Sequence, residues 1–478
     1  MKITFIIPPS LDGEKPAERS AGCTRMVYPI PNIYELTVAA VLEQAGHEVS
    51  YHDFVLMRNG GNMFESFLKN DDSDCYLIWS VNLSMSTDIH AHYLIRKHRP
   101  KSFIIFEGPA PTLYTSKFLI DEHTVIVRGE PELTVKELTE RIENDLDWTN
   151  VDGTSVLKDY VVQTNKPRTL LKNLDELPFP ARHLLGDYQF SNPKLKIHPY
   201  TLVLTSRNCP FHCIYCVPSS LTFARELEYK TRNPGKPPIS FRSVENIKEE
   251  LVMLAEQGYK SVAFIDDNFI VKKDRLEAIV KILKQYGFSW GCQARVDAIT
   301  EDIAKILENS GCKFVDLGVE SFDDSILDYI KKDIHSDDID RGIKMLQKYS
   351  VPVKLNILIG TSPLETIETV NNTLKRAKEL KVSQVMFNIV APFPGTEFYE
   401  LAKANGWIAG GEYTPTDVQR NSILNYPQLS GKQMERLLFK NNLSFFLRPS
   451  FIFMHLKNFS SFTDFKVALR ALKIKLFG

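Results

Sequence analysis

The chain has 478 residues, of which 43% are hydrophobic and 24% are charged, and its formal net charge is −1. This length predicts two or three domains, and the composition is that of a globular chain rather than a disordered one. The near-zero charge gives no general case for nucleic-acid binding, and no apolar run reaches the roughly 18 residues that span a membrane.

The first residues, MKITFIIPPS, hold a short apolar run that stops at Pro8-Pro9. We expect a β-strand here rather than a signal peptide, whose apolar region would be longer. The seven cysteines are odd in number and sparse for the length, which argues against a secreted disulfide framework. We therefore expect a cytoplasmic protein, in which clustered thiols bind metal or take part in chemistry.

Residues 1–145 predict a Rossmann-like domain, because short apolar strands alternate with amphipathic helices. Such alternation is typical of an open, doubly wound parallel sheet of the α/β class. Ligands of these sheets bind outside the carboxyl ends of the strands. The expected strands are 2–8, 47–54, 75–81, 102–108 and 123–129, and a helix is expected over 33–46.

Residues 146–195 lose this alternation and are predicted to be a linker. Over 196–400 the alternation returns with six larger β/α units, which predict a partial (β/α)6 barrel, two units short of a full barrel. Active sites of parallel barrels lie at the carboxyl ends of the strands. The expected strands are 200–206, 260–266, 288–294, 313–319, 351–359 and 382–390, with helices over 243–258 and 363–380.

The last part, 401–478, is predicted to be a helical, basic segment. From Lys440 onward it has seven Lys or Arg residues against one acid, Asp464, and it is rich in Phe and Leu. Such a segment can lie on a membrane surface. The alternative, which we favour, is a pair of helices that packs on the barrel with a solvated basic face.

Three cysteines lie within the stretch CPFHCIYC (209–216), directly after the first strand of the predicted barrel. Structural zinc normally takes four protein ligands in paired knuckles. The chain has no second CxxC, and Cys292 and Cys312 are isolated in strands. His212 adjoins Cys213 and is badly placed to reach the same ion. A zinc site is therefore disfavoured.

The thiols of Cys209, Cys213 and Cys216 fit an iron–sulfur cluster better. A redox dithiol needs only two thiols, so the third would have no role. A [4Fe–4S] cluster takes four ligands, and three thiolates leave one iron open to a substrate or cofactor. The spacing therefore favours a catalytic cluster over a structural one.

This stretch resembles the radical S-adenosylmethionine (SAM) superfamily. The resemblance lies in the CxxxCxxC spacing, in the aromatic residue before the last Cys, and in the position after the first strand of a partial β/α barrel. In that family the open iron chelates the amino and carboxylate groups of SAM. The reduced cluster then cleaves SAM to methionine and a 5′-deoxyadenosyl radical, which abstracts hydrogen from an unactivated carbon. The resemblance implies a [4Fe–4S] cluster and SAM as cofactors.

The resemblance also implies SAM contacts at the carboxyl ends of the later strands. AFIDDNF (263–269) has no Gly-Gly-Glu, the usual site for the SAM amino group, and offers two Asp and an Asn instead. Their alternative role is to cap the following loop and helix. The implied SAM-binding residues are Tyr215, Asp266, Asp267, Asn268, Arg295, Glu320, Ser321 and Gly360.

Three of these have individual roles. Arg295 would contact the SAM carboxylate or ribose, since Arg binds carboxylates through two hydrogen bonds; its alternative is a surface ion pair. Glu320 would hold an amino group or a ribose hydroxyl. At Gly360 the backbone could approach adenine closely.

The open α/β domain ahead of the barrel resembles the cobalamin-binding subfamily, which includes anaerobic magnesium-protoporphyrin ester cyclases and hopanoid-type C-methyltransferases. The matching segments include the EGPAPT loop (107–112), the GEPE turn (129–132), LPFPAR (177–182) and FFLRPSFI (445–452). Asp-x-His-x-x-Gly, which supplies a lower-face His in many cobalamin proteins, does not occur. The implied cobalamin contacts are Asn82, Ser84, Gly108, Pro109, Thr112, Gly129 and Glu130.

Two alternatives to cobalamin stay open for this domain. It could have lost its ligand or bind another one. Methylthiotransferases also carry a preceding α/β domain, but theirs supplies three more Cys ligands, and only Cys23 and Cys75 occur here.

The resemblance implies an oxygen-sensitive enzyme whose favoured reaction is methylation of an unactivated carbon of a small-molecule or lipid-like substrate through methylcobalamin. Cyclisation or rearrangement without methyl transfer is the enzymatic alternative, and a non-catalytic cluster and corrinoid sensor is the other. The expected partner is an electron donor such as flavodoxin or ferredoxin. We expect no nucleic acid, and peripheral membrane contact only through the basic segment.

Overall fold

A computed structural model of the chain describes residues 1–11, 16–57, 59–188, 190–195, 197–382 and 384–449. The chain divides into two compact units. The first comprises Met1–Pro210 with Val217–Cys292, and the second comprises Phe211–Cys216 with Gln293–Gly478. The boundary cuts the thiol loop, so that Cys209 belongs to the first unit and the other two thiols to the second.

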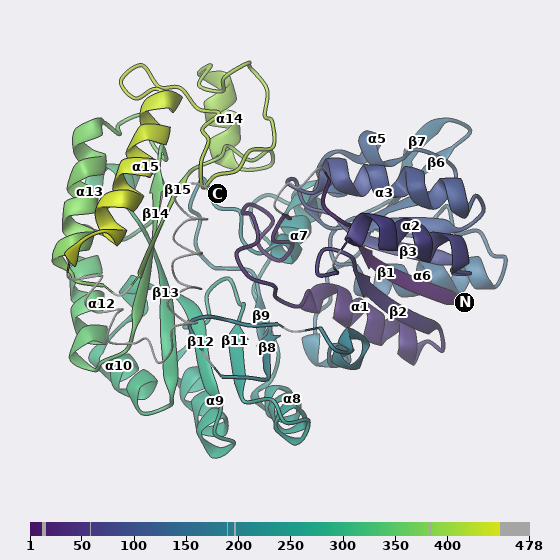
Figure 1. Cartoon of the computed structure of the whole chain (residues 1–478), viewed down its shortest axis with the longest axis horizontal. Coiled ribbons are helices and arrows are strands. Elements are labelled where there is room, and N and C mark those ends of the chain that lie inside the picture. Colours follow the sequence, from purple (N-terminus) through teal and green to yellow (C-terminus); the bar gives the residue numbers. More distant parts are fainter. Residues whose placement is uncertain (12–15, 58, 189, 196, 383, 450–478) are drawn as a thin grey trace. The chain divides into compact units, whose positions relative to one another are not determined.

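The amino-terminal part of the first unit is built on a seven-stranded sheet with the order β2-β1-β3-β4-β5-β6-β7 (Figure 1). The first five strands pair in parallel, and the last two add antiparallel at one edge. The strands are β1 (Lys2–Ile7), β2 (Glu48–Asp53), β3 (Cys75–Trp79), β4 (Phe103–Glu107), β5 (Thr124–Val127), β6 (Thr154–Lys158) and β7 (Val161–Thr164).

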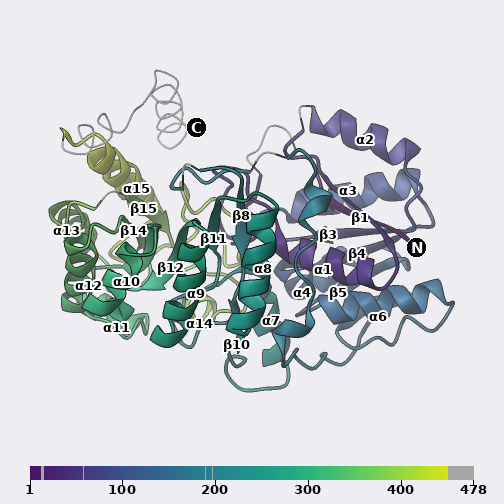
Figure 2. The ribbon, with the colours of Figure 1, turned by 90° about the horizontal axis from the view of Figure 1, so that it is seen from below.

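Helices cover both faces of this sheet, because its strands are apolar on both sides. Phe5 and Ile105 pack in one core with α1 and α6, whereas Ile104 and Phe106 pack in another with α2 and α3. Figure 2 shows the strands between α2 and α3 on one side and α6 on the other. The helices are α1 (Ile33–Gln44), α2 (Gly60–Asn70), α3 (Met85–His98), α4 (Pro109–Leu113), α5 (Thr115–Phe118) and α6 (Glu132–Glu143).

The hairpin β6–β7 lies inside the range that the sequence assigned to a linker. Its turn residues, Asp159 and Tyr160, have φ angles of 51° and 63°, which match the left-handed turns of two-residue hairpins. The residues of β7 are mostly exposed, so the apolar alternation that reveals a half-buried strand is missing. The first sheet therefore continues to Thr164.

The rest of the first unit carries a second parallel set of strands. β8 pairs with β11, and β11 with β12, all in parallel. A short antiparallel pair, β9–β10, follows β8. The elements are β8 (Tyr200–Val203), β9 (Ser206–Arg207), β10 (Ser240–Phe241), β11 (Ser261–Phe264), β12 (Ser289–Arg295), α7 (Ser220–Lys230), α8 (Val244–Glu256), α9 (Lys273–Gln285) and the 3-10 turns Leu174–Glu176 and Arg182–Leu185. The division into units falls within β12, whose last three residues belong to the second unit.

The second unit holds three parallel strands in the order β13–β14–β15. Alternate residues of β14 are buried against helices, while the other face is half-buried. The elements are β13 (Cys312–Glu320), β14 (Val353–Ile359), β15 (Gln384–Ile389), α10 (Glu301–Glu308), α11 (Asp324–Tyr329), α12 (Ser336–Lys348), α13 (Ile367–Glu379), α14 (Glu397–Ala404), α15 (Gly431–Phe446) and the 3-10 turn Val296–Ala298.

All eleven strands that the sequence predicted are present, within a few residues of the expected bounds, and the α/β class is confirmed. The closure of the last six into a partial barrel and the predicted domain boundaries stay predictions. Within the described residues no helix is both long and apolar enough to cross a membrane.

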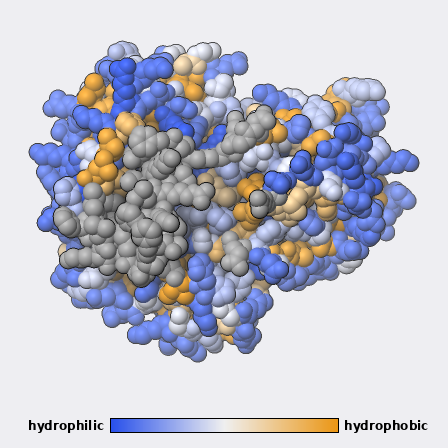
Figure 3. Space-filling view, in the orientation of Figure 1, coloured by the Kyte–Doolittle hydropathy of each residue, from blue (hydrophilic) through white to orange (hydrophobic). Residues whose placement is uncertain are grey.

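The predicted basic segment is described only as far as residue 449, where α15 confirms a helix. Its remaining residues, 450–478, lie outside the described residues, as does the proposed membrane contact of that part. On the face drawn in Figure 3, hydrophilic residues cover most of the surface and hydrophobic ones are scattered among them, as on most folded proteins.

Candidate metal centre and cofactor sites

The three thiols lie on one loop, which follows β9 and leads into α7. None of them forms a disulfide, and all are half-buried. Within the second unit the loop is held by two backbone hydrogen bonds, from Ile214 N to Ile330 O at 3.1 Å and from Phe398 N to Ile214 O at 3.0 Å. A third, from Cys216 N to Cys213 O at 3.2 Å, closes a turn between two thiols.

In the part of the chain that the structure describes, no three His, Cys, Asp or Glu side chains converge so as to hold a metal ion. The candidate ligand set therefore rests on the loop and its spacing. The chemistry of the set fits a cluster, since three cysteines that form no disulfide, on one anchored loop, can all supply thiolates. His212, the alternative zinc ligand, is exposed.

A buried cation stands beside this loop in the second unit. Lys332 Nζ lies 2.8 Å from Glu320 Oε1 and 3.3 Å from the Tyr215 hydroxyl, and Lys332 is only 6% exposed. Burial disfavours its charge, but Glu320 and Cys213 outweigh burial and raise the pKa of Lys332. Burial, with Glu320 and the two thiols behind it, raises the pKa of Tyr215 well above its ordinary value.

Arg295 ends β12 in the same unit and is committed to internal contacts. Its guanidinium binds Asp297 through two hydrogen bonds of 3.0 and 3.1 Å, and it donates to Lys332 O at 2.7 Å. The guanidinium carbon lies 3.5 Å from the centre of the Phe211 ring. Arg295 thus forms an internal ion pair with Asp297 and stacks on Phe211 of the thiol loop. Its contact with SAM stays a prediction.

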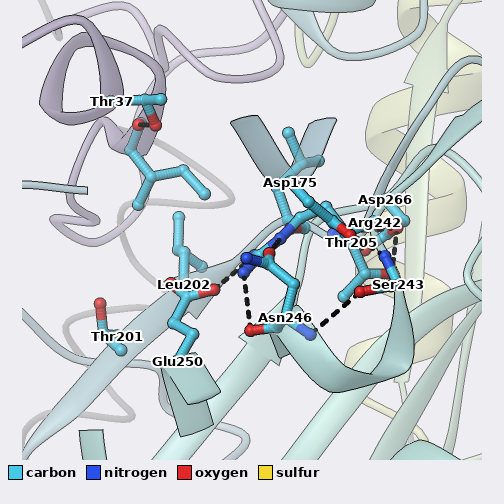
Figure 4. A network of polar contacts seen from close by, with 12 residues as sticks. Thr37, Asp175, Thr201, Leu202, Thr205, Arg242, Ser243, Asn246, Glu250 and Asp266 are labelled. Atoms are coloured by element: carbon cyan, nitrogen blue, oxygen red, sulfur yellow. Dashed lines mark hydrogen bonds and ion pairs between the residues drawn. The ribbon is translucent and has the colours of Figure 1, made fainter. Parts of the chain in front are cut away.

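Asp266, after β11, is fully buried and accepts several hydrogen bonds (Figure 4). The donors are Thr205 N at 3.2 Å, Thr205 Oγ1 at 2.7 Å and the Ser206 hydroxyl. Burial raises the pKa of Asp266, and these hydrogen bonds oppose the rise. Asp266 therefore fixes the turn between β8 and β9, shortly before the thiol loop.

The next two residues differ in their contacts. Asp267 accepts from Ser219 N at 2.7 Å and from Thr222 Oγ1 at 2.6 Å, which ties it to the start of α7. Asn268 is 3% exposed, and its side-chain oxygen has no hydrogen-bond partner among the described residues. A buried acceptor without a donor is costly. Of the three predicted residues, Asn268 is the one left with an acceptor for a ligand.

Two further predicted SAM contacts end strands of the second unit. Ser321 is buried, and its hydroxyl lies 3.4 Å from Thr373 Oγ1. Gly360 has a φ angle of +86°, and a Cβ there would meet Met434 Sδ at 2.8 Å. Its carbonyl accepts from the Tyr426 hydroxyl at 2.7 Å. The close approach at Gly360 is thus to α15, and an adenine contact stays a prediction.

One face of β13–β14–β15 is polar, which is unusual for parallel strands. Asp316 and Lys354 are register partners and form an ion pair at 3.0 Å. Asn356 and Asn388 continue the same face, and the side-chain oxygen of Asn388 has no partner within the described residues. This face can hold a polar small molecule, and the sequence analysis did not single it out.

At the carboxyl edge of the first sheet, a buried ion pair holds the loop after β1. Arg19 binds Asp88 with distances of 2.8 and 3.2 Å, and Asp88 also accepts from Ser80 and Ser84, each at 2.6 Å. Ser84 is therefore committed to Asp88. Asn82 is 3% exposed, and its side-chain oxygen has no partner among the described residues.

The EGPAPT loop opens α4. Gly108 has a φ angle of +96°, and a Cβ there would meet Ser80 O at 2.6 Å, so this position needs glycine for a close approach to β3. Pro109 is the first residue of α4, and Thr112 Oγ1 donates to Gly108 O at 2.9 Å. These residues shape the sheet edge, where their cobalamin contacts stay predictions.

The GEPE turn forms a buried charge cluster with the thiol-bearing part of the same unit. Glu130, which follows Gly129, lies 2.9 Å from Arg207 and 3.0 Å from Arg225. Arg207 also binds Glu132 at 2.6 Å. The predicted ligand contact Glu130 is therefore occupied by two arginines, and it fastens the first sheet to β9 and α7.

Glu107, the last residue of β4, was missed. It is fully buried, and neither carboxyl oxygen has a hydrogen-bond partner among the described residues. Burial, reinforced by Glu35 and Glu132, raises its pKa well above the ordinary value. The sequence did offer a signal for this residue, since Glu107 is an acid that directly follows the apolar run FIIF.

Comparison with known proteins agrees with this arrangement. Residues 203–377 match the family model of the radical SAM superfamily. A protein of Pyrococcus horikoshii named as an uncharacterised methyltransferase is 30% identical over 462 residues, which cover 94% of this chain and 93% of that protein. The anaerobic magnesium-protoporphyrin IX monomethyl ester cyclase of Synechocystis is 24% identical over 78% of this chain and 73% of its own.

Among solved structures, the radical SAM methyltransferase TsrM of Kitasatospora setae, determined with cobalamin and a [4Fe–4S] cluster bound, is similar in fold. The TM-score is 0.65 at 15% identity, over 91% of this chain and 81% of that one.

Proposed function

The chain belongs to the radical SAM superfamily, and we propose that it is a cobalamin-dependent radical SAM enzyme that methylates a carbon of a small-molecule substrate. The observation that carries the proposal is the anchored loop with its three thiols. The sheet ahead of that loop and a relative named methyltransferase over nearly the whole chain support it.

The residues present fit the three groups. Cys209, Cys213 and Cys216 would hold the cluster, and Asn268 offers an unpartnered acceptor to the SAM ammonium. Asn82 and Glu107 offer unpartnered buried groups at the ligand-binding edge of the first sheet. When bound, the cluster supplies the electron that cleaves SAM, and cobalamin supplies the methyl group.

The chain's own residues position and enclose these groups. Two backbone hydrogen bonds fix the thiol loop: Ile214 N donates to Ile330 O, and Phe398 N donates to Ile214 O. Asp266 and Asp267 fix the two ends of the stretch that carries it. The polar face of β13–β15, with the ion pair between Asp316 and Lys354, would bind the substrate.

The reaction class can be tested with methyl-deuterated SAM. The reconstituted protein, reduced under anaerobic conditions, would be incubated with a small-molecule extract, and products would be compared by mass spectrometry. We expect one compound to gain a labelled methyl group in place of hydrogen. A product that changes mass without the label would favour cyclisation or rearrangement. SAM that stays intact in the presence of reduced cluster would favour a sensor.

The proposed reaction requires an electron donor and a substrate. Reduction of the cluster needs a one-electron donor, for which flavodoxin or ferredoxin has suitable chemistry. The polar face in the second unit favours a small polar substrate over a lipid.

The role of Asn268 gives a direct prediction. Asn268→Leu removes the only side-chain oxygen that could accept from the SAM ammonium at this position, so SAM binding should weaken about tenfold or more. Asn268→Asp keeps the acceptor and should bind SAM as tightly as the parent. Equilibrium dialysis with cluster-loaded protein measures both constants. Equal SAM affinity in Asn268→Leu would rule out the assignment.

A second prediction concerns Glu107. If its unpartnered carboxyl is kept for a corrinoid, Glu107→Leu should weaken hydroxocobalamin binding about tenfold, while Glu107→Gln, which keeps a polar side chain of the same shape, should not. The same Glu107→Leu change removes an unsatisfied buried polar group and should raise the apoprotein's melting temperature. Absorption titration and thermal unfolding measure the two effects. Unchanged cobalamin affinity in Glu107→Leu would contradict the role.

A further inference from the structure

We infer that Lys332 and Glu320 set the reduction potential of the cluster on the thiol loop, with Lys332 raising it and Glu320 lowering it. This inference rests on the proposed function only in that the three thiols must hold an iron–sulfur cluster. It does not depend on cobalamin or on the substrate.

The first support is the place of the charged pair. Lys332 and Glu320 are both buried, at 6% exposure each, and their charged atoms are 2.8 Å apart. The ammonium group also lies 3.3 Å from the hydroxyl of Tyr215, which precedes Cys216 directly. A charge in such a buried site acts more strongly than one in water, because the surroundings screen it less.

The second support is that the pair cannot move away from the loop easily. Ile330 O accepts from Ile214 N at 3.1 Å. Ile330 precedes Lys332 by two residues, and Ile214 lies between Cys213 and Cys216 in the sequence, so this hydrogen bond ties the two segments together. Arg295 donates to Lys332 O at 2.7 Å. The pair is therefore held by backbone contacts on more than one side.

The third support is local backbone strain at Glu320. The register between β13 and β14 shifts between Gly318 and Glu320, and Glu320 has a φ angle of +66°. Non-glycine residues with such angles cost energy and concentrate at functional sites. A Cβ at Gly318 would lie 2.9 Å from Glu320 Oε1 and 3.0 Å from Lys332 Nζ, so glycine makes room for the pair.

The direction of each effect follows from charge. Reduction adds one electron to the cluster, so a nearby cation stabilises the reduced form and a nearby anion destabilises it. The two residues together are neutral, and only the loss of one of them leaves an uncompensated charge. Opposite shifts from two neighbouring residues are a pattern that general loosening of the site would not produce.

The experiment is a redox titration of the anaerobically reconstituted full chain, followed by visible absorption and electron paramagnetic resonance. All variants are titrated at the same pH. Lys332→Met should lower the midpoint potential and Glu320→Gln should raise it, each by about a tenfold change in the reduction equilibrium. Lys332→Arg and the double variant Lys332→Met/Glu320→Gln should lie near the parent.

Lys354→Met is the matched control, since Lys354 also pairs with a carboxylate in the second unit but has no contact with the thiol loop among its described partners. Its potential should equal that of the parent. The inference would be overturned if the midpoint potential shifted in the same direction in both single variants, or if it did not shift in either. The proposed function would then remain intact. If the parent itself binds no iron, the proposed function fails, and the iron count shows this before any potential is measured.

Discussion

Cys213→Ala is expected to remove the bound iron and all cleavage of SAM. Three thiolates hold three irons of a [4Fe–4S] cluster, and neither Cys292 nor Cys312 is placed to replace one, because both are buried within strands. Iron analysis and the visible spectrum of anaerobically reconstituted protein measure the loss, and 5′-deoxyadenosine formation measures the activity. Cys209→Ala and Cys216→Ala should behave in the same way.

Cys292→Ala is the control, because it changes a buried thiol within strand β12 rather than one on the loop. It should keep the parent's iron content and its SAM cleavage. A Cys213→Ala protein that retained full iron and activity would refute the assignment of the thiol loop as the cluster site.

The largest expected effect on stability comes from Glu250 on α8. Its carboxylate is fully buried between two arginines, at 2.6 Å from Arg182 and in an ion pair with Arg242, which also donates to Leu204 O at 2.9 Å (Figure 4). Burial disfavours the charge, but the two arginines outweigh it and lower the pKa of Glu250. Glu250→Ala would leave two buried cations unpaired, so the free energy of unfolding should fall by about 3–5 kcal/mol.

Denaturant unfolding of the full chain measures this change in the free energy of unfolding. Glu249→Ala, one residue away but exposed on the same helix, should change the free energy of unfolding by less than about 0.5 kcal/mol. A loss below about 1 kcal/mol in Glu250→Ala would mean that the arginines find other partners or water, and that the network does not fasten the segment around Arg182 to β8 and α8.

The sequence predicted most strands because parallel sheets need nearly continuous apolar runs, which stand out at 75–79 and 103–107. It predicted the thiol loop because metal ligands require particular residue types at close spacing. The hairpin β6–β7 escaped notice because an exposed edge strand such as Val161–Thr164 carries no such apolar pattern.

The contacts of individual site residues were less predictable. Lys332 lies twelve residues after Glu320 in sequence, and only the path of the chain through α11 brings the two together. Asp266 and Glu130 have the right residue type for ligand contacts, yet hydrogen bonds and ion pairs inside the protein occupy them. Some buried acids have partners inside the protein, and others, like Glu107, have none among the described residues. The difference depends on packing, which residue types alone do not reveal.

The most direct test of the account is the metal content and visible spectrum of protein reconstituted without oxygen, incubated with hydroxocobalamin and desalted. We expect about four irons and about one cobalt per chain, with the absorption of both cofactors. Iron without cobalt would contradict the cobalamin-dependent methyltransferase and leave a radical SAM enzyme whose first sheet binds something else. Protein without iron would contradict the central claim itself.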